Sequence, residues 1–229
     1  MVYYLWVICM IYIILIIICL YIIFLAFKSF KKNEFNMFGF NFCKYTLGWF
    51  FRFWYPFKTE NKKVIPKDGP ILLCGNHIHL MDQCLAILST NRPVHYMDKI
   101  EYFTNPKTRW FFKLAGCIPV NRQIKDENAK SAALDVLNKG LALGIFPEGT
   151  RNKTNELLQP FKFGAVSMAK KTNATIVTFA ITGDYKFRTK NLKVTFGKPF
   201  KVGELDLEEA NEKLYNEILS IIKKEKGIK

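Results

Sequence analysis

Residues 71–89 read ILLCGNHIHLMDQCLAILS, and this stretch sets the class of fold. Ile71–Cys74 is a short apolar run, which predicts a strand buried in a sheet. Asp82–Ser89 is typical of an α-helix, and residues 75–81 connect the two. A strand, a loop and a helix in this order form the repeating unit of α/β proteins, whose functional residues gather in such loops.

The same alternation of strands and helices continues toward the C-terminus. Further strands are predicted over residues 94–97, 118–120, 141–146, 175–181 and 192–196. Further helices are predicted over residues 106–115, 127–139 and 164–171, and a final helix begins after Asp206, where Glu209 completes the spacing of a capping box. The sequence therefore predicts an α/β domain with a mixed, partly parallel sheet and helices packed around it.

Met1–Phe27 carries no charged residue. As a helix this stretch is about 40 Å long, whereas the hydrocarbon core of a bilayer is about 30 Å thick. A cleaved signal peptide fits poorly, because no basic segment precedes the apolar run and no small-residue cleavage site follows it. A helix buried in a soluble core is the alternative. We expect a membrane anchor over residues 1–32, and Lys28, Lys31 and Lys32 predict that the rest of the chain lies on the cytoplasmic side.

Residues 35–57 form a second unusual segment, rich in Phe, Trp and Tyr, that also contains Lys44 and Arg52. Aromatic rings beside basic residues suit the headgroup boundary of a bilayer, whereas charges are costly at its centre. An interfacial helix is therefore predicted. A helix packed on the globular domain is the alternative, and one helix can do both on opposite faces. The polar stretch 58–69 is typical of a linker or turn. The expected division is an anchor over 1–32, the aromatic helix and linker over 33–60, and a globular domain over 61–229.

Lys and Arg total 34 against 19 Asp and Glu, which gives a formal net charge of +15. Such a surplus either solvates the surface or indicates an anionic partner: nucleic acid, an anionic membrane or a phosphorylated substrate. The apolar N-terminus favours membrane lipids over nucleic acid. The six cysteines form no C-x-x-C pair, so neither a disulfide framework nor a zinc site is expected.

The loop GNHIHLMD, residues 75–82, holds the candidate catalytic residues. A neutral imidazole removes a hydroxyl proton well near pH 7, so His77 is a candidate general base. A carboxylate on the other ring nitrogen fixes the tautomer, and Asp82 supplies one if the turn folds back. The alternative is a helix-capping Asp beside a surface His. His79 completes an H-x-H pair, but no H-E-x-x-H motif or carboxylate cluster supports a metal site.

Two further segments carry candidate substrate ligands. Arg122 ends the segment GCIPVNR (116–122), and its guanidinium can grip a phosphate through two parallel hydrogen bonds. A surface ion pair is the alternative for this residue. In FPEGTRN (146–152), Pro147 and Gly149 predict a tight turn, and Gly149 lets the backbone approach a ligand closely.

The remaining candidates lie on this turn and just after it. Thr150 and Arg151 offer hydrogen-bond donors for a phosphate. Glu148 is expected to bind a substrate hydroxyl or to orient Arg151. Lys162 adds a cation before the helix predicted from residue 164, and helix N-termini also favour anions. A structural turn with an Arg–Glu ion pair is the alternative.

Taken together and in this order, the three segments resemble the motifs of the glycerolipid acyltransferase family, and within it the bacterial 1-acylglycerol-3-phosphate acyltransferases. The family's H-x-x-x-x-D motif matches His77 and Asp82, with Asn76 before the histidine as is common. Its G-x-I-x-V-x-R block matches residues 116–122, and its F-P-E-G-T-R-S block matches residues 146–152 with Asn in place of the last Ser. In a fourth block, which usually carries V-P, Thr178 stands where the proline is expected. The resemblance covers about residues 60–200.

The resemblance implies that His77 activates an acceptor hydroxyl for direct attack on an acyl thioester, without a covalent acyl-enzyme. The absence of a G-x-S-x-G motif agrees with this. The implied acceptor is lysophosphatidic acid, the product is phosphatidic acid, and the donor is acyl-coenzyme A or an acyl carrier protein thioester. The substrate-binding residues implied are Asn76, Arg122, Glu148, Gly149, Thr150, Arg151 and Lys162. No cofactor or metal is expected.

Two alternatives stay open. The acceptor can be glycerol 3-phosphate or another lysophospholipid. The chain can also be a non-catalytic basic protein that binds anionic lipids at a membrane surface, which explains the charge and the anchor but leaves the three motifs as coincidence.

Overall fold

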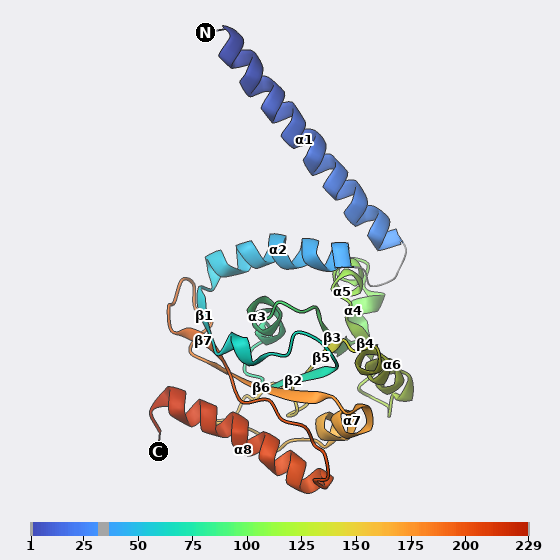
Figure 1. The fold of residues 1–229 in the computed structure, drawn as a ribbon, viewed down its shortest axis with the longest axis vertical. Coiled ribbons are helices and arrows are strands. Elements are labelled where there is room, and N and C mark those ends of the chain that lie inside the picture. Colours follow the sequence, from blue (N-terminus) through green and yellow to red (C-terminus); the bar gives the residue numbers. More distant parts are fainter. Residues whose placement is uncertain (1, 32–36, 229) are drawn as a thin grey trace.

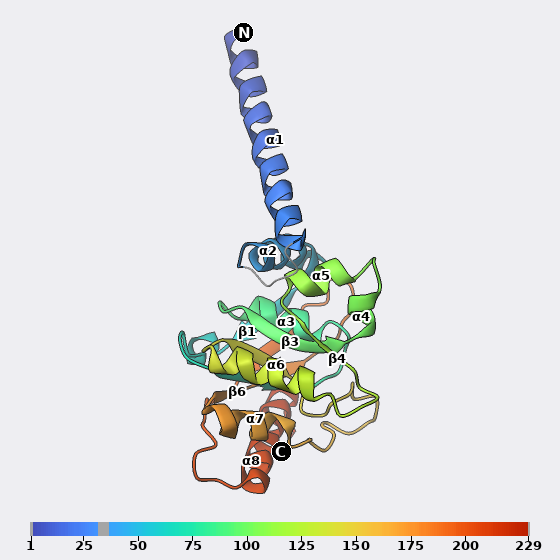
Figure 2. The ribbon, with the colours of Figure 1, turned by 90° about the vertical axis from the view of Figure 1, so that its right-hand side faces the viewer.

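The computed structural model describes residues 2–31 and 37–228. A long helix, α1 (Val2–Lys31), projects from the remainder, which folds into a central sheet with helices on both faces (Figure 1). α2 (Met37–Trp54) lies across the end of the domain nearest α1, and Figure 2 shows the same arrangement from the side. The two N-terminal helices therefore occupy one end of a layered α/β domain.

Within the described residues the sheet has seven strands in the order β1-β7-β6-β2-β5-β3-β4. Neighbouring strands run parallel except β6 and β7, which are antiparallel, so the predicted mixed, partly parallel sheet is confirmed. The strands are β1 (Phe57–Glu60), β2 (Ile71–Gly75), β3 (Val94–Lys99), β4 (Ile118–Val120), β5 (Ala142–Ile145), β6 (Thr175–Thr182) and β7 (Leu192–Phe196).

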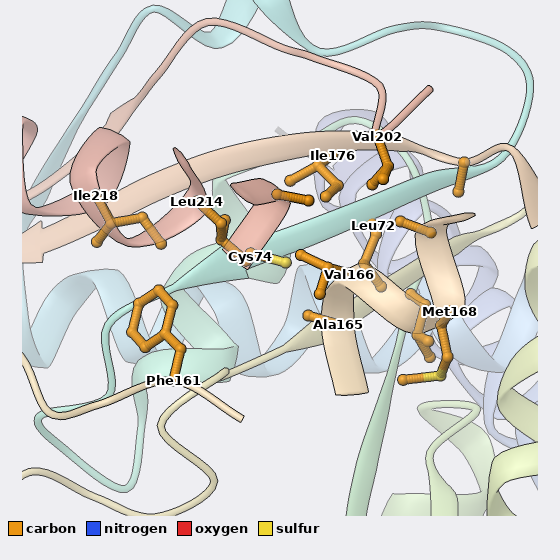
Figure 3. Packing of buried hydrophobic residues seen from close by; sticks show 14 of the residues in the cluster. Leu72, Cys74, Phe161, Ala165, Val166, Met168, Ile176, Val202, Leu214 and Ile218 are labelled. Atoms are coloured by element: carbon orange, nitrogen blue, oxygen red, sulfur yellow. The ribbon is translucent and has the colours of Figure 1, made fainter. Parts of the chain in front are cut away.

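The helices divide between the two faces of the sheet (Figure 1). α2 and α3 (Asp82–Ser89) cover one face, while α6 (Glu127–Asn138), α7 (Gly164–Thr172) and α8 (Leu207–Lys226) cover the other. α4 (Glu101–Thr104) and α5 (Arg109–Leu114) join β3 to β4, and the 3₁₀ helix η1 (Lys62–Val64) follows β1. Figure 3 shows the second face, where side chains of α7 and α8 pack on those of β2 and β6.

The position of β2 explains why its sequence is apolar throughout. Alternate side chains of a strand point to opposite faces of the sheet. Ile71 and Leu73 join the core beneath α2 and α3, whereas Leu72 and Cys74 join the core beneath α6, α7 and α8. All four are fully buried, as a central strand of a parallel sheet requires when helices cover both faces.

α1 is suited to a bilayer and not to the domain core. Trp6–Leu25 is long and apolar enough to cross a membrane, and none of that stretch is buried within the fold. So large an apolar surface is unfavourable in water. The alternative of a helix inside a soluble core is therefore wrong, and α1 associates the chain with a membrane.

α2 divides its side chains between the domain and the outside. Phe40, Cys43 and Phe51 are buried on the domain. The exposed face is aromatic and apolar, and comprises Met37, Phe38, Tyr45, Leu47, Trp49, Phe50, Phe53 and Trp54. The alternative of a helix packed on the domain is thus confirmed for one face. Contact between the other face and a membrane stays a prediction.

Both basic residues of α2 bond backbone carbonyls of the domain, with Lys44 half-buried and Arg52 exposed. Lys44 donates from Nζ to the carbonyl of Thr90 at 2.6 Å, and Arg52 donates to the carbonyl of Leu88 at 3.3 Å. Burial, with help from neighbouring cations, lowers the pKa of Lys44 to about 8. These bonds complement the carbonyls at the C-terminal end of α3 and hold α2 in place.

Two local predictions were wrong in part. Phe57, expected at the end of the aromatic helix, and residues 58–60, expected in a linker, form the edge strand β1, which pairs with β7 from far along the chain. The helix predicted over 106–115 is present as α5 but begins later, because the chain turns between Asn105 and Thr108, where the Thr108 hydroxyl bonds the carbonyl of Tyr102. The short helix α4, which precedes this turn, was not predicted. In both places a distant or irregular contact overrides the local pattern.

Gly144 of β5 is expected to tolerate no side chain. An added Cβ would lie 2.2 Å from Cζ of Tyr96, whose ring is buried. Gly144→Ala should therefore lower the free energy of unfolding by about 1–3 kcal/mol, the usual cost of overpacking. Gly164→Ala is the matched control, because no described heavy atom lies within 4 Å of a Cβ added there. Thermal unfolding of the full chain in detergent measures both, and an unchanged Tm for Gly144→Ala would contradict the packing described.

Candidate active site

His77 and Asp82 meet where β2 gives way to α3. Asp82 is the first residue of α3 and is fully buried, and its Oδ2 lies 2.8 Å from Nδ1 of His77. The backbone N–H groups of Ile78 and His79 donate to the same oxygen at 2.6 and 2.8 Å. The carboxylate therefore folds the loop back on itself, and the turn needed for a His–Asp pair is present.

The imidazole is held in one orientation by aromatic packing. The ring of His77 stacks on Phe146, with centroids 4.3 Å apart and planes 12° apart. Phe146 in turn stacks on the buried ring of Tyr96. Because Nδ1 faces a carboxylate, the neutral ring keeps its proton there and leaves the lone pair of Nε2 available. This arrangement suits a general base.

The loop 146–152 is fastened to the backbone of His77. The N–H of His77 donates to Oε1 of Glu148 at 2.7 Å, and the N–H of Asn152 donates to the carbonyl of His77, also at 2.7 Å. Oε2 of Glu148 accepts from the N–H of Gln159 at 3.0 Å. Burial raises the pKa of Glu148, although these hydrogen bonds partly oppose the shift. The carboxylate of Glu148 therefore holds two loops together, and the predicted contact with a substrate hydroxyl or with Arg151 stays a prediction.

Asn76 was also predicted as a substrate ligand, and its side chain is engaged elsewhere. Its Nδ2 donates to the carbonyl of Ile181 at 2.9 Å, and its Oδ1 accepts from the N–H of the same residue at 2.7 Å. The side chain is buried, so it extends the pairing of β2 and β6 by one step beyond the strand. The geometry favours a positioning role over direct contact with substrate.

The other predicted ligands are open to solvent around this loop. Gly149, Thr150, Arg151, Lys162 and Arg122 are all exposed. Gly149 has a φ of 73°, and a Cβ there would lie 3.0 Å from both Cε and Nζ of Lys162, so the lysine side chain passes directly over the turn. Burial lowers the pKa of His79, and the charge of Arg151 lowers it further. Burial raises the pKa of Asp98, and the charges of Arg122 and His77 partly oppose that shift. Three exposed cations thus border the His–Asp pair, an arrangement that suits an anionic ligand.

Tyr185 is the contact that sequence reasoning missed. Its hydroxyl donates to Oδ1 of Asp82 at 2.6 Å, and its ring stacks on His79 with centroids 4.0 Å apart. Tyr185 follows β6, and β6 runs parallel to β2. Because parallel neighbours end at the same edge of a sheet, the residues just after both strands could have been expected to meet.

Among residues 2–31 and 37–228, no three His, Cys, Asp or Glu side chains gather as a metal site requires. His79, the second half of the H-x-H pair, accepts a hydrogen bond from the N–H of Met81 at 3.3 Å. Burial is the main cause that lowers the pKa of His79. In the described part of the chain, His79 therefore belongs to no cluster of side chains that could hold a metal ion.

Comparison with known proteins adds an independent result. Residues 56–182 match the model of the acyltransferase family. The chain is 33% identical over 130 residues to the 1-acyl-sn-glycerol-3-phosphate acyltransferase of Borreliella burgdorferi, a match that covers 56% of this chain and 52% of that protein. It is 29% identical over 147 residues to the protein of the same name from Bacillus subtilis, covering 62% of this chain and 72% of the relative. The match thus spans about half the length of the Borreliella protein.

The fold also matches a solved structure. The 1-acyl-sn-glycerophosphate acyltransferase of Thermotoga maritima superposes with a TM-score of 0.72, over 90% of this chain and 87% of that one, at 20% sequence identity. At this level of identity the match establishes a shared fold.

The role of Asn76 can be tested by stability. Asn76→Ala removes both hydrogen bonds and leaves the buried N–H and carbonyl of Ile181 without them. Each unsatisfied buried group costs about 1–3 kcal/mol, so the free energy of unfolding should fall by several kcal/mol, measured by thermal unfolding of the full chain. An unchanged Tm would restore the earlier prediction that the amide serves a ligand.

Proposed function

This chain belongs to the acyltransferase family, and we propose that it transfers a fatty acyl group from an acyl thioester to the free hydroxyl of 1-acylglycerol 3-phosphate, forming phosphatidic acid. The observation that carries the proposal is the hydrogen bond between His77 and the buried carboxylate of Asp82. The names of the Borreliella and Bacillus relatives support the choice of acceptor.

His77 is the general base in this reaction. Nε2 removes the proton of the acceptor hydroxyl while the hydroxyl oxygen attacks the carbonyl carbon of the thioester. The tetrahedral intermediate then collapses, the C–S bond breaks, and the imidazolium returns the proton to the departing sulfur. Asp82 stabilises the imidazolium and holds the tautomer, as the acidic member of a Ser-His-Asp triad does. The acyl group passes directly to the acceptor, so no acyl-enzyme forms.

The acceptor phosphate is held by the exposed cations beside the pair. Arg122 and Arg151 present planar guanidinium groups that match a phosphate through paired hydrogen bonds. Lys162 adds a point charge over the turn at Gly149, and the hydroxyl and backbone of Thr150 add donors. A non-catalytic lipid-binding protein would need these cations but would gain nothing from a buried carboxylate that orients a histidine.

The reaction moves an acyl group from a thioester sulfur to a hydroxyl oxygen, and it needs neither a redox group nor a metal. We therefore assign no cofactor. The acyl donor is a thioester of coenzyme A or of acyl carrier protein, and both carriers are anionic, as the +15 net charge favours.

The reaction takes place at a membrane surface. α1 anchors the chain, and Lys28, Lys31 and Lys32 after the apolar stretch favour a domain on the cytoplasmic side. The exposed aromatic face of α2 lies on the bilayer, which brings the site to an acceptor that is itself a membrane lipid.

The proposal predicts product formation that depends on the His–Asp pair. With labelled lysophosphatidic acid and either donor, the wild type should form phosphatidic acid. His77→Ala should lower kcat by about 10²–10⁴-fold, the usual contribution of a general base. Asp82→Asn should reduce kcat strongly with little change in acceptor KM, because it disturbs the tautomer and not the phosphate contacts.

A panel of acceptors and both donors completes this experiment. Preference for glycerol 3-phosphate or another lysophospholipid would change the acceptor and keep the mechanism. If a folded and membrane-bound protein forms no product from any acceptor with either donor, the proposed enzymatic function is overturned in favour of a lipid-binding protein.

Arg151→Ala separates phosphate binding from the chemical step. Loss of a hydrogen bond to a charged group costs about 1.5–3 kcal/mol, so the acceptor KM should rise about 10-fold to 100-fold with kcat nearly unchanged. Lys153→Ala is a control, since this exposed cation lies on the same loop outside the proposed ligand set. An equal rise in the KM of donor and acceptor would point to a structural role for Arg151.

A further inference from the structure

We propose that Tyr185 is a further positioning residue of this reaction: its hydroxyl fixes the carboxylate of Asp82, and the loop that carries it is held in place by α2. The inference rests on the proposed function, because it concerns the same His–Asp pair. Three sets of contacts carry it: those of the carboxylate, those of the tyrosine ring and those of the loop.

The two oxygens of the Asp82 carboxylate have different partners. Oδ2 accepts from three donors on its own loop, namely the N–H groups of Ile78 and His79 and Nδ1 of His77. Oδ1 accepts from Tyr185 at 2.6 Å, the short distance typical of a hydroxyl bonded to a charged oxygen. A fully buried carboxylate needs donors on both oxygens, and the tyrosine supplies the one that the loop cannot. It therefore fixes the rotation of the carboxylate that orients His77.

Toward the carboxylate of Asp82 the phenol acts as a donor. Burial, together with the nearby charge of Asp82, raises the pKa of Tyr185 far above its ordinary value. The hydroxyl thus keeps its proton throughout the reaction and takes no part in proton transfer. Its role is to position the carboxylate.

The ring of Tyr185 is fixed from two sides. It stacks on His79, with planes 20° apart, and it meets the ring of Tyr55 edge-on at 5.6 Å between centroids. Tyr55 also lies edge-on to His79. Packing of three rings leaves the hydroxyl little freedom to leave Asp82.

The loop between β6 and β7 is closed at its base. Gly183 has a φ of 92°, and a Cβ there would lie 2.3 Å from the carbonyl oxygen of Asn191, so the two backbones approach closely. Asp184 and Asn191 then exchange hydrogen bonds of 3.2 and 3.0 Å. Residues 184–191 therefore project as one closed loop.

The tip of the same loop is fastened to the C-terminal end of α2. The N–H of Arg188 donates to the carbonyl of Trp54 at 2.9 Å, and its guanidinium lies 5.3 Å from the centre of the Phe53 ring. Phe187 packs edge-on against Trp54, with centroids 4.8 Å apart. Four residues of chain, 185–188, thus connect α2 to Asp82: Arg188 bonds Trp54 at one end and Tyr185 bonds Asp82 at the other.

The test compares Tyr185→Phe, which keeps the ring and removes the hydroxyl, with Tyr55→Phe as a matched control in the same aromatic cluster. In the full-length protein in lipid vesicles, Tyr185→Phe should lower kcat roughly tenfold or more, the effect of losing one hydrogen bond to a charged group, with both KM values nearly unchanged. Tyr55→Phe should keep the wild-type kcat. Arg188→Ala should lower kcat by a smaller factor, because it loosens the loop and leaves the hydroxyl in place.

A double-mutant cycle distinguishes positioning from a general loss of stability. If Tyr185 acts through Asp82, Tyr185→Phe should have almost no further effect on kcat in an Asp82→Asn background. Equal fold-changes in both backgrounds, or a wild-type kcat in Tyr185→Phe, would overturn the inference while leaving the proposed function intact.

A readout without turnover keeps the two proposals apart. In protein labelled with ¹⁵N-histidine, the resonance of the His77 Nδ1 proton should move in Tyr185→Phe and stay in Tyr55→Phe. An unmoved resonance in Tyr185→Phe would overturn the inference even if phosphatidic acid is formed. Movement of the resonance would support it even if the acceptor proves to be another lipid.

Discussion

The site depends on one constraint: the carboxylate of Asp82 is buried at the start of α3 and needs hydrogen-bond donors there. A buried carboxylate is costly unless donors surround it. The chain meets this requirement by folding residues 76–81 back over the N-terminal end of α3 and by bringing in Tyr185 from the loop that follows β6. The orientation of His77 is a consequence of this arrangement. The catalytic geometry and the local stability of the loop are therefore the same set of hydrogen bonds.

The parallel centre of the sheet makes this gathering possible. β5, β2 and β6 lie side by side, and their C-terminal ends open at one edge. Phe146 and Glu148 follow β5, His77 follows β2, and Tyr185 follows β6. Two polar side chains hold the segments after these strands together: Glu148 bonds the backbone of His77, and Asn76 bonds the backbone of Ile181. Part of each motif thus serves the backbone, and only part is available for the proposed substrate contacts.

The sequence predicted those features that rest on local signals. β2, α3, β4 and the capping box at Asp206 and Glu209 all appear where the pattern places them, since burial and capping act within a few residues. The spacing of His77 and Asp82 allowed a His–Asp pair only if the loop folds back, and the resemblance to the acyltransferase motif favoured that pair over a capping Asp beside a surface His. What could not be read locally are contacts between segments about 70 to 135 residues apart. Strand β1 pairs with β7, Glu148 holds His77, and Asn76 holds Ile181, and in each case the partner is chosen by the assembled sheet. Neither the edge strand nor the positioning roles of these two polar residues has a local signature.

The hydrogen bonds of Lys44 and Arg52 have a consequence for how the molecule meets different bilayers. Both cations of α2 bond carbonyls of the domain, and only Arg52 stays exposed, so the outward face of that helix consists mainly of uncharged rings. Adhesion through this face should then depend only weakly on lipid headgroup charge and on ionic strength, which screens exposed charges. Arg122, Arg151 and Lys162 are exposed and behave in the opposite way. Membrane contact and binding of an anionic molecule therefore use two surfaces that respond differently to salt. Membrane contact through α2 can persist at a salt concentration that weakens binding of the anionic molecule.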